Sequence, residues 1–79
     1  MAQLKELVEY IARSIVSHPE EVEVTEGEEG RDRILVTLRV HPDDKGRVIG
    51  RRGQVAQSVR SLLRVAATKD GVHANLDID

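Results

Sequence analysis

The chain has 79 residues, of which 39% are apolar and 33% charged, and its formal net charge is −2. A chain of this length supports one hydrophobic core, so we expect a single domain over residues 1–79. It contains no cysteine, which excludes disulfides, thiolate metal sites and cysteine nucleophiles. No basic segment followed by an apolar run begins the chain, and no run approaches eighteen apolar residues. We therefore expect a cytoplasmic protein that does not act on membranes.

Apolar residues at three- and four-residue steps predict an amphipathic helix from about Gln3 to about Ser17. Pro19 cannot continue the helical hydrogen-bond ladder, so the helix ends before it. The apolar period then changes to two, which predicts strands at residues 22–25 and 31–40. The polar segment Gly27–Gly30 between them predicts a hairpin turn.

The second half of the chain predicts two helices and a strand. Pro42 starts a short helix that reaches about Ile49, and Gly50 and Gly53 then bracket a tight turn. The next helix extends to about Lys69, and a final strand covers residues 72–78. The predicted buried stripe of this second helix consists of Val55, Ala56, Val59, Leu62, Leu63 and Ala66. The element order is αββααβ, which places the chain in the α+β class.

Charge is unevenly distributed along this sequence. Residues 18–30 carry six acids and no Lys or Arg, whereas residues 45–69 carry seven bases and no acid. These bases are Lys45, Arg47, Arg51, Arg52, Arg60, Arg64 and Lys69. A locally basic surface in an acidic protein is typical of a nucleic-acid site.

The turn Gly50-Arg51-Arg52-Gly53 lies in this basic segment. Glycine lets the backbone approach a ligand closely, and the start of the following helix presents unpaired N–H groups to an anion. Guanidinium groups pair with phosphate oxygens through two hydrogen bonds. Most glycine-containing turns between helices are only turns, but two arginines inside the turn and an acid-free helix after it favour a phosphodiester ligand.

The stretch Val48–Gly53 resembles the I-G-x-x-G signature of KH domains, whose loop clamps about four nucleotides by their backbone. The element order is similar to the type II KH fold, in which helices cover one face of a mixed three-stranded sheet. Residues 40–53 more closely resemble the KhpA family of stand-alone bacterial KH proteins. Two positions depart from the usual KH pattern. Lys45 stands where an apolar residue is usual, and Ala56 stands where many KH domains have a larger aliphatic residue.

The resemblance implies a non-enzymatic protein that binds single-stranded RNA. The implied RNA-binding residues are Gly50, Arg51, Arg52, Gly53, Arg47, Lys45, Ile49, Ala56, Arg60 and Arg39. The glycines would hold the sugar-phosphate backbone, while the aliphatic residues would contribute to a groove for bases. The resemblance also implies a KhpB (Jag-like) partner or a homodimer, and a role in RNA chaperoning, post-transcriptional regulation or control of cell shape.

Other interpretations remain open at this stage. An enzyme would need a cluster of catalytic groups, but we expect His18, His41 and His73 to be surface residues rather than ligands or bases. We expect no metal, cofactor or small-molecule substrate. A helix-turn-helix DNA-binding protein and a protein-interaction module are the alternatives. Tyr10 is the only residue among Phe, Trp and Tyr in this sequence, and it is predicted to lie off the apolar stripe of the first helix. Because the sequence offers no set of aromatic rings on which bases could stack, we expect weak, salt-dependent binding of nucleic acid.

Overall fold

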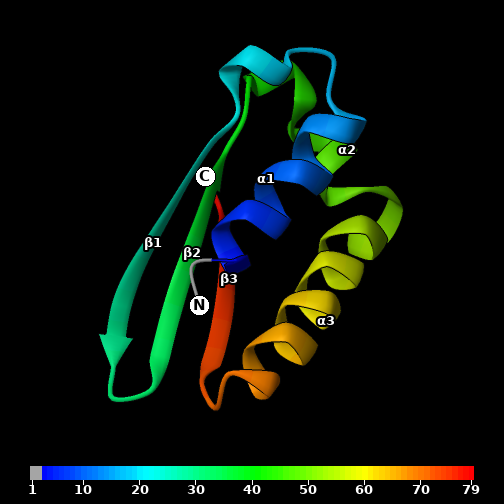
Figure 1. Ribbon diagram of the computed structural model, residues 1–79. Coiled ribbons are helices and arrows are strands. Elements are labelled where there is room, and N and C mark those ends of the chain that lie inside the picture. The colour runs from blue at the N-terminus through cyan, green and yellow to red at the C-terminus, as the bar shows by residue number, and fades with distance from the viewer. Residues whose placement is uncertain (1–2) are drawn as a thin grey trace.

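The computed structural model describes residues 3–79, which form a three-stranded sheet with helices packed on one face (Figure 1). The strands are β1 (Glu23–Gly30), β2 (Arg33–Arg39) and β3 (His73–Ile78). The helices are α1 (Gln3–Ile15), α2 (Lys45–Ile49) and α3 (Gln54–Lys69). Strand β2 is central, antiparallel to β1 and parallel to β3. This architecture confirms the predicted αββααβ order and the mixed sheet.

The core lies between the sheet and the helices α1 and α3. Alternate residues of β2 point into it, and Val36 and Leu38 are buried. In α1, steps of four residues bring Leu4, Val8 and Ala12 onto the same buried side. The two periodicities that predicted these elements therefore arise from the same core.

The buried stripe of α3 differs from the predicted one at Leu62, which is 53% exposed. The helix buries Ala56, Val59, Leu63 and Ala67, at steps of three and four residues. Because successive residues are about 100° apart on a helix, Leu62 lies to one side of this stripe. Including Leu62 in the core was wrong, since the apolar surface of α3 is wider than the face it buries.

The hairpin turn also lies elsewhere than predicted. Gly27 and Glu28 pair with residues of β2, so the expected turn at Gly27–Gly30 was wrong. The turn is at Arg31 and Asp32, and Asp32 adopts a left-handed φ of +59°. Aspartate tolerates this backbone better than most residues, so the hairpin closes without glycine in the left-handed position.

Helix α1 ends at Ile15, two residues before the predicted end at Ser17. Within residues 3–79, no helix is long and apolar enough to span a membrane.

Candidate nucleic-acid interface

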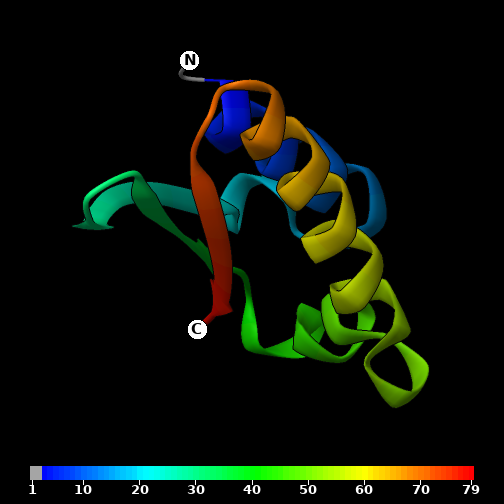
Figure 2. The same ribbon diagram turned by 90° about the horizontal axis from the view of Figure 1, so that it is seen from below.

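Helices α2 and α3 are joined by the loop Gly50–Gly53, which projects from the N-terminal end of α3 away from the sheet (Figure 2). Three of its four residues have a positive φ: +77° at Gly50, +57° at Arg52 and +74° at Gly53. The Gly50 N–H donates to the Gly46 carbonyl at 2.8 Å, which closes α2. The Gly53 N–H donates to the Gly50 carbonyl at 3.2 Å, which closes the loop itself.

The two glycines are required for different reasons. A Cβ atom at Gly50 would lie 2.4 Å from the Val55 Cγ2 atom and 2.8 Å from the Val55 backbone nitrogen. A Cβ atom at Gly53 would meet no atom of residues 3–79 within 4 Å. Gly50 therefore needs both its conformation and the absence of a side chain, whereas Gly53 needs only its left-handed backbone.

Arg52 holds a left-handed backbone although it is not glycine. This conformation costs about 1–2 kcal/mol for an ordinary residue. Strain of this kind is concentrated at functional sites, where the surrounding structure enforces it. The observed backbone of Arg52 therefore marks the loop as a candidate site on grounds independent of its charge.

Positive charge surrounds the loop. Arg47, Arg51 and Arg52 are exposed, as is Lys45 at the start of α2. Within the described residues none of these four side chains forms an intramolecular ion pair. The first turn of α3 holds no acidic residue, and no side chain in the described part of the chain caps its N-terminus. The loop thus presents free cationic groups beside backbone N–H groups that lack side-chain acceptors.

The remaining candidate residues lie around this loop in different environments. Ile49 precedes the loop and is 41% exposed, whereas Ala56 is only 3% exposed. Arg60 is half-buried on α3, seven residues beyond Gly53, or about 10 Å along the helix. Ile49 and Arg60 therefore keep accessible surface, whereas Ala56 is almost fully covered by the rest of the protein.

Arg39 differs from the other cationic candidates because it already has acidic partners. Its Nη2 atom lies 3.1 Å from an Asp79 carboxylate oxygen, and its Nη1 atom lies 4.0 Å from Glu23. It shares a surface hollow with Lys45, Glu20, Glu21 and Asp79. The structure thus places Arg39 in a locally acidic neighbourhood at the end of β2.

Comparison with known proteins identifies the family. The KhpA/KhpB KH domain family model matches residues 5–78. The chain belongs to this family. The resemblance that residues 40–53 indicated is thereby confirmed, and the helix-turn-helix interpretation loses its basis.

Several relatives match this KH domain over nearly their whole length. RNA-binding protein KhpA of Halalkalibacterium halodurans is 45% identical over 75 residues, which cover 95% of this chain and 97% of the relative. RNA-binding protein KhpA of Clostridium perfringens is 41% identical over 75 residues, covering 95% and 99%. RNA-binding protein KhpA of Aquifex aeolicus is 37% identical over 78 residues, covering 99% and 98%.

A solved structure shares the fold at low sequence identity. Era from Aquifex aeolicus, crystallised as a variant bound to GDP and aluminium fluoride, superposes with a TM-score of 0.58 at 17% identity. The match covers 96% of this chain and 29% of the Era chain. At this identity the match supports the fold of this domain and carries no information on its function.

The structure adds Asp44, which sequence reasoning did not single out. Asp44 is 1% exposed, and its carboxylate accepts the backbone N–H groups of Ser17 and His18, each at 3.0 Å. It joins the segment after α1 to the start of α2, which leads into the Gly50–Gly53 loop. No local sequence pattern predicts this contact, because Ser17 and His18 are 27 and 26 residues away from Asp44 in the chain.

Burial alone would raise the pKa of Asp44. The hydrogen bonds from Ser17 and His18 and the charge of His18 outweigh burial, and the pKa lies below its ordinary value of 3.8. The carboxylate is therefore ionised at neutral pH. Asp44 acts as a charged acceptor that fixes how the KH helices meet.

Proposed function

We propose that this KH domain binds single-stranded RNA without catalysing a reaction, and that the Gly50–Gly53 loop grips the sugar-phosphate backbone. One observation carries the proposal: Arg51 and Arg52 are exposed, form no ion pair within residues 3–79, and lie on a strained loop that leads into the start of α3, which no side chain of these residues caps. RNA is favoured over DNA because the relatives are named RNA-binding proteins.

In this proposal the phosphates lie against the loop. Arg51 and Arg52 donate to phosphate oxygens. The Gln54 N–H already donates to the Arg51 carbonyl, so the contribution of the α3 N-terminus comes from the backbone N–H groups that follow it. Lys45 and Arg47 on α2 add attraction at longer range. The absence of a side chain at Gly50 keeps the backbone open to the nucleotide chain.

The bases would lie beside α2 and the first turns of α3. Ile49 offers an exposed apolar surface there, and Arg60 reaches base edges or a further phosphate. Ala56 supports the packed base of the site rather than an open groove. Arg39 takes part only by exchanging Asp79 for a phosphate, because its guanidinium group is already paired.

Affinity should come mainly from charge. Stacking a base on an aromatic ring contributes about 1–3 kcal/mol, but Tyr10 is exposed on α1 and precedes the loop by forty residues. Binding should therefore be weak and tolerant of sequence, and it should fall steeply as salt is added. A second RNA-binding domain would raise the effective affinity without new contacts in this one.

The proposed cellular role is that of a cytoplasmic RNA chaperone or post-transcriptional regulator that acts with a partner, including in control of cell shape. The partner would be a KhpB-like protein or a second copy of this chain. Leu62 and Val65, one turn apart on α3, are exposed apolar residues of the kind that protein interfaces bury. They also support the protein-interaction alternative, which is compatible with RNA binding.

Fluorescence anisotropy with a labelled single-stranded RNA tests the proposal. The Arg51→Asp, Arg52→Asp double variant should bind at least about tenfold more weakly, because a hydrogen bond to a charged group contributes about 1.5–3 kcal/mol. Aspartate is chosen because it tolerates the left-handed backbone at position 52. The control is Arg31→Asp, Arg33→Asp, which makes the same charge change at the hairpin end of the sheet, opposite α2 (Figure 1).

Circular dichroism must first show that both variants are folded. Equal binding by the wild type and the loop variant would overturn the loop mechanism and favour the protein-interaction alternative. Equal weakening by both variants would show that net charge, rather than the loop, determines binding.

A further inference from the structure

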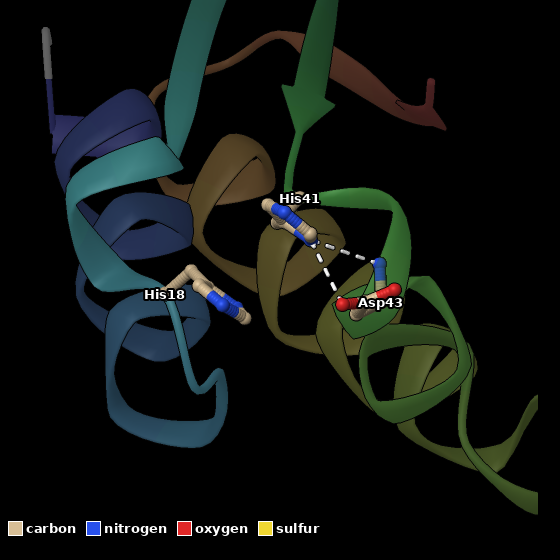
Figure 3. Close-up of side chains that lie close together, drawn as sticks. All are labelled: His18, His41 and Asp43. Carbon is tan, nitrogen blue, oxygen red and sulfur yellow. Dashed lines mark hydrogen bonds and ion pairs between the residues drawn. The ribbon is translucent and has the colours of Figure 1, made fainter.

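A cluster of three potential metal ligands lies at the junction between the end of α1 and the start of α2, separate from the Gly50–Gly53 loop. His18 follows α1, and His41 and Asp43 precede α2 (Figure 3). One nitrogen of each histidine and one carboxylate oxygen of Asp43 all lie within 4.8 Å of one another. Sequence reasoning expected both histidines at the surface but had no means of bringing them together.

A second observation concerns the group behind His18. The Nδ1 atom of His18 lies 3.0 Å from the buried carboxylate of Asp44. An ionised carboxylate can only accept hydrogen bonds, so Nδ1 carries a proton, and Nε2 has a free lone pair whenever the ring is neutral. A histidine oriented by a carboxylate in this way is the usual outer-shell arrangement of protein metal sites.

We propose that His18, His41 and Asp43 bind one divalent transition-metal ion, with Zn²⁺ as the representative ion and water completing the coordination. Two imidazoles and one carboxylate favour ions such as Zn²⁺, Ni²⁺ and Cu²⁺ over Mg²⁺ and Ca²⁺, which prefer oxygen ligands. The three ligands come from two chain segments, so the ion would link the end of α1 to the start of α2.

Binding requires a change in the histidine pair. The two rings are stacked, with centroids 4.1 Å apart and planes inclined by 15°. Each lone pair lies in the plane of its own ring, so two stacked rings cannot both point to one ion. One ring must rotate, and His41 is free to do so. Within residues 3–79 its side chain interacts only with the neighbouring Asp43, through the Asp43 N–H at 3.1 Å and the Asp43 carboxylate at 3.6 Å.

The required movement is small. Ligands of a tetrahedral zinc ion lie about 3.4 Å apart when the metal-ligand bonds are about 2.1 Å long. Ligand atoms that are now 4.8 Å apart must therefore approach each other by about 1.4 Å. His18 and His41 are half-buried and Asp43 is exposed, which leaves room for rotation without disturbing the core. His18 stays in place, held by Asp44.

Isothermal titration of the tag-free protein with ZnCl₂, together with NMR of the imidazole nitrogens, tests this site. We expect saturable binding of one zinc ion per chain, and a coordination shift at His18 Nε2 and at one nitrogen of His41. The variants His18→Gln, His41→Gln and Asp43→Asn should each weaken binding by about tenfold or more. The control His73→Gln removes the exposed histidine of β3 and should bind zinc like the wild type.

The NMR measurement on the wild type decides the question even if a variant is poorly folded. Zinc-induced shifts at His73, or the absence of saturable binding, would overturn the proposal. Retention of the stacked-ring signals of His18 and His41 at saturating zinc would also overturn it, because the ion cannot bind both rings in the stack. None of these outcomes depends on RNA binding.

Discussion

Replacing Gly50 with alanine should destabilise the protein far more than replacing Gly53, although both glycines belong to the same loop. Gly50 has φ +77° and ψ 175°, a region that residues with side chains almost never occupy, at a strain of about 1–3 kcal/mol. Its new Cβ would also lie 2.4 Å from the Val55 Cγ2 atom. Relieving such an overlap costs about 1–3 kcal/mol more. The expected total for Gly50→Ala is about 2–6 kcal/mol.

Gly53 provides a matched comparison. Its φ of +74° and ψ of 14° lie in the ordinary left-handed region, and its Cβ position is open. Gly53→Ala should therefore lower the free energy of unfolding by only about 1–2 kcal/mol. Gly53→Asn should lower it by less, because asparagine tolerates this backbone.

Urea denaturation followed by circular dichroism measures all three variants. The midpoint for Gly50→Ala should be clearly below that for Gly53→Ala, with an unchanged dependence on denaturant. Equal midpoints for the two alanine variants would refute the reasoning, since they would show that the contact with Val55 imposes no constraint.

Two further predictions concern the core and its charged group. Leu63→Ala should cost about 2–5 kcal/mol of unfolding free energy, because Leu63 is fully buried, whereas Leu62→Ala should cost about 0.5 kcal/mol or less; similar losses in thermal denaturation would contradict the assigned helix face. The lowered pKa of Asp44 means that its contribution to stability is complete above the ordinary aspartate pKa and is lost as the pH falls through the lower folded value. Asp44→Asn should therefore be less stable than the wild type at neutral pH and should show a flatter decline in acid; parallel pH profiles would contradict this.

The sequence predicted the helices and strands whose apolar periodicity results from packing one side against the core. Alternation in β2 and the three- and four-residue steps in α1 and α3 directly record which side faces the core. The Gly50–Gly53 loop was also predictable, because its glycines and arginines are neighbours in the chain. The strained backbone of Arg52 was not predictable, since arginine as a residue type does not favour a left-handed φ.

The failures have equally specific causes. Residues 27–30 are polar and exposed, so they have the composition of a turn, yet their backbone pairs with β2. Leu62 is apolar but lies outside the stripe that α3 buries. The contacts of Asp44 with Ser17 and His18 join segments far apart in the sequence. Such contacts depend on how α1 and α2 pack, which no local pattern contains.

The dependence of RNA affinity on salt tests the central claim most directly. For single strands, the logarithm of the binding constant falls against the logarithm of salt concentration with a slope of about −0.7 for each phosphate neutralised. If Arg51 and Arg52 each neutralise one phosphate, the slope of their double aspartate variant should be shallower by about 1.4, while the Arg31→Asp, Arg33→Asp control should keep the wild-type slope. An unchanged slope in the loop variant would contradict the account, because the phosphates would then be held elsewhere.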